Sequence, residues 1–194
     1  MREYTDQYRI QKADPTEAPE LYRLMRTVWE RLENKDLFAV EGMDLEWFRK
    51  FLDPRRGFCV TARSETGELA GILMVCRPME DDDNLGLDVG MTPEQRLRVV
   101  HMETAAVLPE HRGHDLERRM LAFAEEKLQG TDTRYLMATI SPFNPPSLRA
   151  AERLDYQVLL TKEKYGGHLR HILIKGINGG SPDDLSCAEG RKLV

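Results

Sequence analysis

A strand, a tight turn, a helix and a second strand follow one another within residues 98–140, and this order constrains the fold more than any other feature. Residues 98–107 have the composition of a strand, and residues 116–128 have a helical spacing that ends at Gly130. Residues 135–140 are the second strand candidate. Because such crossovers are right-handed and bring the two strands into parallel alignment, we expect a sheet that contains a parallel pair.

The remaining segments predict antiparallel strands and further helices. Asp14-Pro15-Thr16-Glu17 has the N-cap, proline and glutamate typical of a helix start, and its apolar stripe is expected to run from Leu21 to Leu32. Ser64-Glu65-Thr66-Gly67 suits a hairpin connection. In chain order we expect a strand at 7–13, a helix from Pro15, a helix after Asp44, strands at 58–63 and 68–76, a short helix after Asn144, and strands at 156–161 and 169–175.

The chain is expected to form one domain followed by a tail. Residues 77–93 carry the acidic run Glu80 to Asp83 among glycines and prolines, which indicates an exposed loop with little structure of its own. After Gly176 the sequence is rich in Gly, Ser and Asp and has little periodicity. We therefore predict a mixed α/β domain over residues 1–176, with a mostly antiparallel sheet flanked by about four helices, and a tail at 177–194 outside the core.

Charge and composition exclude several classes of partner. The chain has 28 Lys and Arg against 33 Asp and Glu, a formal net charge of −5, which removes the electrostatic basis for general nucleic-acid or anionic-membrane binding. It begins without a signal-peptide pattern and has no apolar run of the ~18 residues that a membrane helix needs. We expect a cytoplasmic protein.

The cysteines and histidines do not indicate a metal site. Cys59, Cys76 and Cys187 are an odd number without C-x-x-C spacing, so neither a disulfide framework nor a zinc site is expected. His111 and His114 lie three residues apart but lack an evident third ligand. We predict reduced thiols and no metal.

The segment from Val107 to Glu117 joins the end of a strand to the start of a helix through a tight turn. Unpaired N–H groups at a helix N-terminus point outward, and the helix dipole adds positive potential, so such a turn can hold a pyrophosphate. Arg112 could add a forked, permanently charged contact.

This segment also resembles the coenzyme A motif of the GNAT N-acetyltransferase superfamily, V-x-P-x-x-R-G-x-G-x-[GAQ]. Asn144-Pro145-Pro146-Ser147 resembles the family's later N-x-x-[AS] element, and Leu154-Asp155-Tyr156 stands where L-G-[FY] is usual. The segment from Lys164 to Leu173 is similar to the ending of one bacterial branch. By order of elements, the resemblance spans residues 8–176.

The resemblance implies a sheet opened by its parallel pair, with acetyl-CoA entering there as co-substrate. It also implies that the turn holds the pyrophosphate, that the backbone of the preceding strand pairs with the pantetheine arm, and that two polar side chains lie beside that arm. The residues of the turn are Arg112, Gly113, His114, Asp115, Leu116 and Glu117. The strand residues beside the pantetheine arm are Ala105, Ala106 and Val107, and the two polar side chains are Asn144 and Ser147.

Three positions depart from the family pattern. Asp115 stands where glycine is usual, and Glu117 where a small or amide residue is usual. A carboxylate beside a pyrophosphate is repulsive unless it points away, and Asp115 could instead accept backbone N–H bonds as a helix cap. Ala151 stands where a tyrosine often protonates the departing thiolate, which leaves Tyr156, Tyr165 or a water as candidates.

Candidate bases lie on the strand before the turn. Acyl transfer needs a neutral amine, yet an amine with a pKa near ~10 is mostly protonated at neutral pH. Counting back from Val107 by two residues places Ala105, Glu103 and His101 on one face, and relatives of the family place bases at the last two positions. We take Glu103 as the first candidate and His101 as the second; ordinary ion-pair and hydrogen-bond roles are the alternative.

The sequence therefore predicts an N-acetyltransferase that moves an acetyl group from acetyl-CoA to a primary amine by direct attack. The acceptor is expected to be a small molecule or a peptide, with no nucleic-acid or membrane partner, and a homodimer is allowed. The alternative is a non-catalytic acyl-CoA-binding or regulatory module, motivated by Asp115 and Ala151. A third interpretation is an interaction domain that has lost the cofactor.

Overall fold

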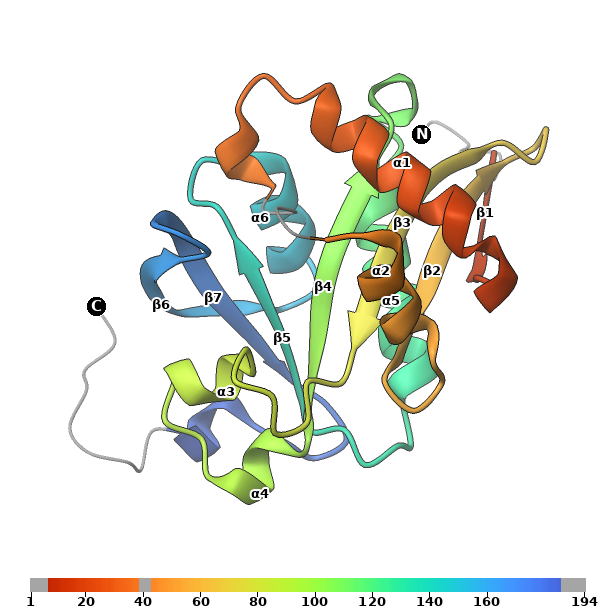
Figure 1. Ribbon diagram of the computed structural model, residues 1–194. Coiled ribbons are helices and arrows are strands. Elements are labelled where there is room, and N and C mark those ends of the chain that lie inside the picture. Colours follow the sequence, from red (N-terminus) through yellow and green to blue (C-terminus); the bar gives the residue numbers. More distant parts are fainter. Residues whose placement is uncertain (1–6, 39–42, 186–194) are drawn as a thin grey trace, which may run out of the picture.

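The computed structural model describes residues 7–38 and 43–185, which form one seven-stranded sheet with helices on both faces (Figure 1). The strands are β1 Tyr8–Lys12, β2 Gly57–Ser64, β3 Leu69–Cys76, β4 Val99–Val107, β5 Tyr135–Ile140, β6 Gln157–Lys164 and β7 His168–Gly176. The α-helices are α1 Ala18–Glu30, α2 Leu45–Leu52, α3 Leu85–Asp88, α4 Pro93–Arg96, α5 Leu116–Leu128 and α6 Pro145–Glu152. Short 3₁₀ turns are η1 Pro15–Glu17, η2 Lys35–Leu37, η3 Pro109–His111 and η4 Pro182–Leu185.

The sheet has the order β1-β2-β3-β4-β5-β7-β6, and β4–β5 is its parallel pair among antiparallel neighbours. The predicted fold class is therefore confirmed. The expected four helices correspond to α1, α2, α5 and α6, while α3 and α4 are additional single turns. All eight residues of β3 are buried, because helices cover both faces of this central strand.

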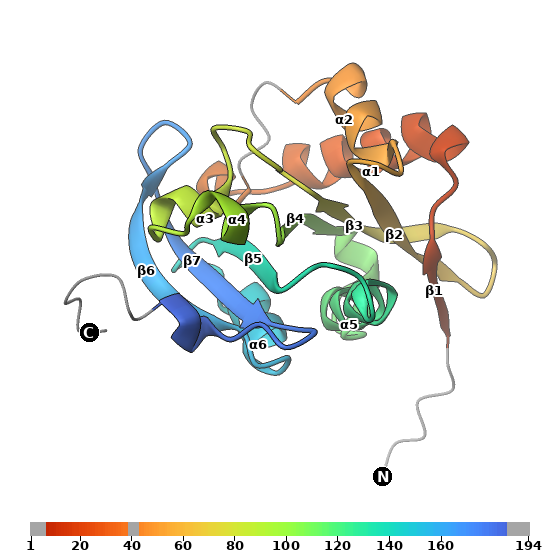
Figure 2. The same ribbon diagram turned by 90° about the horizontal axis from the view of Figure 1, so that it is seen from below.

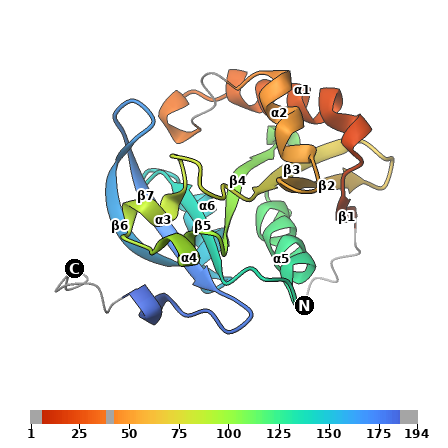
Figure 3. The same ribbon diagram turned by 60° about the horizontal axis from the view of Figure 1, so that its bottom comes forward.

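The helices form two layers around the sheet. Figures 2 and 3 show α1 to α4 on one face and α5 with α6 on the other. The stripe of α1 packs Leu21, Met25 and Val28 against the sheet. The capping box predicted at Asp14 is present, but it starts a 3₁₀ turn that leads into α1; Leu32 lies beyond the end of the helix at Glu30.

The prediction of a loop with little structure at residues 77–93 is wrong. The segment contains α3 and the start of α4, and Leu85 and Met91 are buried in an apolar cluster with Val99. The side chain of Asn84 accepts a hydrogen bond from the Gly86 N–H and thereby caps α3. Tertiary burial of a few apolar residues, rather than helical periodicity, orders this segment.

β4 and β5 are paired over only a short length. Their register joins Val99 to Tyr135 and His101 to Met137, and beyond these residues the strands part towards the top of Figure 1. The backbone edge of β4 that faces β5 is consequently open along the second half of the strand.

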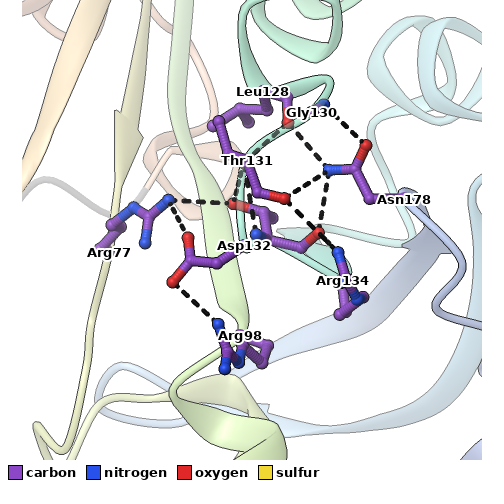
Figure 4. A network of polar contacts seen from close by, with 9 residues as sticks. Arg77, Arg98, Leu128, Gly130, Thr131, Asp132, Arg134 and Asn178 are labelled. Carbon is purple, nitrogen blue, oxygen red and sulfur yellow. Dashed lines mark hydrogen bonds and ion pairs between the residues drawn. The ribbon is translucent and has the colours of Figure 1, made fainter.

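A polar network holds the closed end of this pair together (Figure 4). The Asp132 carboxylate accepts hydrogen bonds from Arg77, which follows β3, and from Arg98, which precedes β4. The Asn178 amide donates to the carbonyl oxygens of Leu128, Thr131 and Thr133 and accepts from the Gly130 N–H. These contacts join the ends of α5, β3, β4, β5 and β7.

The first residues after β7 pack on the core. Ile177 is buried, and its N–H donates to the Arg134 carbonyl, so the expectation that the whole tail lies outside the core is wrong for these residues. The division into a domain at 1–176 and a tail stays a prediction, since residues 186–194, including Cys187, lie outside the described residues.

Cys59 and Cys76 are free and buried thiols.

Within residues 7–38 and 43–185, none of the helices has the length and apolar character required to cross a membrane.

Replacing Asn178 tests whether the closed end is held by its amide. We expect Asn178→Ala to lower the free energy of unfolding by about 2 kcal/mol, because several partly buried backbone groups lose their partner. Urea unfolding measures the change. The control is Asn34→Ala, which removes one exposed cap from a 3₁₀ turn and should cost clearly less. Equal losses would contradict the proposed role of the network.

Candidate active site

A cavity of about 1110 Å³ opens where β4 and β5 part. On one side of the sheet it is lined by the turn before α5 and by the start of α6; on the other side it reaches α1 and the η2 segment. Glu103 and all eleven predicted cofactor-binding residues line it, whereas His101 does not. The structure therefore brings residues that are far apart in the sequence around one cavity that passes through the sheet.

The turn between β4 and α5 presents backbone groups to this cavity. Gly113 has φ 84° and Asp115 has φ 58°, so the chain takes two left-handed steps before the helix begins at Leu116. A side chain at position 113 would meet no atom within 4 Å, which leaves space beside the backbone. The first-turn N–H groups of a 13-residue helix, together with its dipole, make this end suitable for an anion.

Asp115 does not cap α5, so of the two alternatives for its carboxylate the helix cap is wrong. It makes no cap hydrogen bond; its Oδ2 lies 2.6 Å from Arg118 Nε, one turn along the helix. The left-handed backbone explains the difference, since the N-cap conformation that aims a side chain at the first turn is extended. Arg112 donates from Nε to the Val107 carbonyl at 3.4 Å and lies on the surface.

Glu117 faces Ser147 across the gap between α5 and α6. The Ser147 hydroxyl donates to Glu117 Oε2 at 3.0 Å, and Asn144 Oδ1 accepts from the Ser147 N–H at 3.4 Å as the cap of α6. Burial raises the pKa of Glu117 to about 7, a shift that the Ser147 hydrogen bond opposes only in part. This carboxyl is therefore largely neutral below neutral pH.

A bulge in β4 separates Glu103 from the strand end. Met74 pairs with Thr104 and Val75 with Met102, so no β3 residue is opposite Glu103. Ala105 and Val107 pack against the α5-side cluster, whereas His101 contacts the backbone of α3 on the other face. The alternation that was expected to place Ala105 on the same face as Glu103 and His101 is thus interrupted and wrong for Ala105, while Glu103 and His101 remain in contact.

Glu103 is the centre of a hydrogen-bonded group. Its Oε2 accepts from His101 Nδ1 at 3.3 Å and from the Cys76 thiol at 3.7 Å, and His101 Nε2 accepts from the Leu85 N–H at 3.1 Å. Burial opposes ionisation of Glu103, but the His101 side chain, the Cys76 thiol and the charge of Lys164 together outweigh it, so the pKa of Glu103 is below the ordinary value. Glu103 is therefore a carboxylate at neutral pH.

The side chains of Cys76, His101 and Glu103 are close enough to hold a metal ion, with ligand atoms within 4.8 Å of one another. However, the Leu85 N–H occupies the lone pair of His101 Nε2, which keeps the proton on Nδ1, the nitrogen that faces the group. Burial also raises the pKa of the Cys76 thiol well above its usual value, whereas a metal ligand must be a thiolate. The arrangement is suited to hydrogen bonding.

The tyrosine candidates lie on opposite faces of the sheet. Tyr165 has the unusual φ of 52°, and its hydroxyl lies 3.2 Å from Thr139 Oγ1 on the parted section of β5. Tyr156 packs in the α5-side cluster, where burial and then the charge of Glu125 raise its pKa. Ala151 is buried in α6 and offers no proton. Sequence reasoning missed Cys76, Leu85 and Thr139 as parts of the site, because no motif links them to the turn.

The chain matches one described family of enzymes. A family model described as the acetyltransferase (GNAT) family matches residues 18–156. No curated protein sequence matches the chain.

Solved acetyltransferase structures share the fold at low sequence identity. The ribosomal-protein-S18-alanine N-acetyltransferase of Escherichia coli aligns with a TM-score of 0.63 and 13% identity, over 91% of this chain and 97% of that one. NAA60 of Arabidopsis thaliana, solved with a bisubstrate analogue, aligns with a TM-score of 0.65 and 14% identity, over 89% and 99%. The protein yncA of Salmonella typhimurium, solved with its cofactor acetyl-CoA, aligns with a TM-score of 0.65 and 16% identity, over 91% of this chain and 97% of that one.

Glu117 should make the stability of the protein depend on pH. Its folded pKa of about 7 lies above the ordinary value of 4.5, so the folded state is penalised as pH rises through this interval, and the full penalty applies above it. Glu117→Gln should therefore stabilise the protein by roughly 2 kcal/mol at pH 8 and by little at pH 5. Thermal melts across this range measure the difference. Glu126→Gln, an exposed change on the same helix, is the control, and parallel curves for wild type and Glu117→Gln would contradict the assignment.

Proposed function

The chain belongs to the acetyltransferase (GNAT) family, and from this premise we propose that it is an N-acetyltransferase that acts on a primary amine of a small molecule or peptide. Family membership is consistent with acetyl-CoA as the co-substrate. One observation carries the proposal: the same cavity is lined by the uncapped N-terminus of α5 and by the ionised Glu103. An acyl donor and an acceptor can therefore approach the same point from opposite faces.

The donor side would be held largely by backbone groups. The turn from Arg112 to Glu117 would take the pyrophosphate, and the open edge of β4 at Ala105 to Val107 would pair with the amides of the pantetheine arm. Asn144 and Ser147 would lie beside that arm. These residues fit the group: Asp115 is neutralised by Arg118, and Glu117 becomes neutral when it is protonated.

The acceptor nitrogen would attack the thioester carbonyl directly. Glu103 would take the proton from the ammonium, directly or through one water, while backbone N–H groups near Val107 polarise the carbonyl oxygen. A C–N bond forms as the C–S bond breaks; the nitrogen then loses its second proton to water, and the thiolate takes up a proton from a tyrosine hydroxyl or water. Both tyrosine candidates stay open, since Tyr156 lines the cavity and the Tyr165 hydroxyl lies beside Thr139, where the strands part.

The acceptor side joins an apolar wall to negative charge. Leu32, Leu37 and Phe38 line the cavity near α1 and η2. Burial and the neighbouring Glu103 carboxylate raise the pKa of Asp83, which indicates that both acids face the same region. Carboxylates attract an ammonium group, and the wall can cover its carbon skeleton. A peptide acceptor is supported by the fold shared with the ribosomal-protein-S18-alanine N-acetyltransferase, and a small amine is the alternative.

The rival function, a non-catalytic acyl-CoA-binding module, is favoured by Ala151, because no tyrosine on α6 protonates the leaving group. Release of free thiol from acetyl-CoA across a panel of amines, amino acids and peptides separates the two functions. Amine-dependent release supports the enzyme. Calorimetric binding of acetyl-CoA without turnover of any amine would support the module, and absence of binding would support an interaction domain.

Loss of the base should affect turnover more than binding. We expect Glu103→Gln to lower kcat/KM for the best acceptor by roughly 10²-fold, as removal of a general base requires, while acetyl-CoA affinity stays near wild type. Steady-state kinetics and calorimetry measure the two effects. Glu126→Gln on the exposed face of α5 is the matched control. Full activity of Glu103→Gln would refute the assignment of the base.

A further inference from the structure

We propose that His101 is a positioning residue and not a second base: with Cys76 it fixes one oxygen of the Glu103 carboxylate and leaves the other for the acceptor. The Leu85 N–H of α3 in turn fixes His101. This inference rests on the proposed function, in which Glu103 takes the proton of the acceptor. It assigns a role to a segment that was expected to be an unstructured loop.

The bonding of the imidazole determines which of its nitrogens carries the proton. A backbone N–H is always a donor, so the bond from Leu85 at 3.1 Å requires a lone pair on His101 Nε2. The proton of the neutral ring is then on Nδ1, which donates to Glu103 Oε2 at 3.3 Å. Both nitrogens are occupied, and the side chain is 3% exposed and does not line the cavity. His101 therefore has no free nitrogen to accept a proton from a substrate.

The two oxygens of Glu103 have different environments. The His101 and Cys76 donors both lie on Oε2, while Oε1 has no hydrogen-bond partner among the described residues. Glu103 lines the cavity, and its side chain is 22% exposed. Two donors on one oxygen fix the plane of the carboxylate, so the remaining oxygen is presented in one orientation.

The donor in α3 is itself held in place. Asn84 caps α3 and donates to the carbonyl oxygens of Met79 and Arg96, which closes the loop around Leu85. At the other end of α3, the Asp88 carboxylate pairs with Lys162 at 2.7 Å and Lys164 at 2.5 Å, both on β6. Contacts from two sides therefore fix the Leu85 N–H that selects the tautomer of His101.

The charges around Glu103 give the proposal a readout that depends on pH. On its own sheet, the His101 and Cys76 hydrogen bonds favour the ionised form, as does the charge of Lys164 from β6. Asp83 from the α3 segment and Tyr165 from the β6–β7 turn also face it, and burial together with the Glu103 charge raises the pKa of both. Without the His101 donor, burial is less well opposed, so the pKa of Glu103 should rise.

The experiment compares His101→Ala with His101→Asn, whose amide N–H can still donate to Glu103. We expect His101→Ala to lower kcat about 10- to 100-fold. In the plot of kcat/KM against pH, the acidic limb, where activity rises as Glu103 ionises, should move to higher pH. His101→Asn should restore most of the rate and return the limb towards wild type. His171→Ala removes a half-buried histidine of β7 that bonds Thr161 of β6, and it should change neither quantity.

A second pair of variants covers the case in which His101→Ala does not fold, as judged by thermal melts. Cys76→Ala removes the other donor to Oε2 and should also move the limb to higher pH, whereas Cys76→Ser keeps a donor and should move it less. If neither His101→Ala nor Cys76→Ala moves the limb, the positioning role is refuted. If His101→Asn is as inactive as His101→Ala while Glu103→Gln stays active, His101 is the base and both proposals fail. If Glu103→Gln is inactive while the acidic limb stays in place in His101→Ala and Cys76→Ala, only the positioning role is refuted, and Glu103 remains the base of the proposed function.

Discussion

The short parallel pairing of β4 with β5 is the constraint on which the rest of the structure depends. The register runs only from Val99 and Tyr135 to His101 and Met137, and the strands then separate. An unpaired strand edge inside a protein leaves backbone donors and acceptors without partners, which is costly unless something completes them. A ligand that carries amide groups can do so along β4. The separation also makes a passage through the sheet, so that two substrates need not compete for one face.

The donor side of this passage shows how a helix N-terminus can tolerate acidic residues. The dipole of α5 favours an anion, and two carboxyl groups lie where a phosphate would be expected. Asp115 is directed to Arg118, so its charge is compensated within the helix. Glu117 has no ion-pair partner in the part of the chain that the structure describes, and burial raises its pKa to about 7. Protonation, rather than ion pairing, is thus the means by which this second carboxyl avoids repulsion.

Sequence patterns predicted the long elements and failed where tertiary contacts decide the structure. The helix at 116–128, the strand at 135–140 and the anion-binding turn follow from periodicity and from residue types that act locally. In contrast, α3 is four residues long and is ordered by the burial of Leu85 among side chains of distant strands. The β4 bulge could not be predicted either. An extra residue in a strand turns the side chains that follow it to the opposite face of the sheet, while the composition of the strand stays the same. The residues that line the cavity beside α5 and α6 were therefore accessible from sequence, whereas the environment of Glu103 was not.

That environment balances two opposing requirements of a buried base. Burial alone would neutralise Glu103, and a neutral carboxyl can neither attract an ammonium group nor take its proton. The donors from His101 and Cys76 keep it ionised, but each also stabilises the negative charge and so weakens it as a base. Because both donors act on Oε2, the other oxygen keeps its lone pairs free while the whole group stays charged. A carboxylate with a lowered pKa is a modest base, so proton removal is favourable only if the ammonium is itself desolvated on entering the passage. In the function proposed above, the apolar wall formed by Leu32, Leu37 and Phe38 would supply that desolvation, and an acceptor whose amine is carried on an apolar group would suit it.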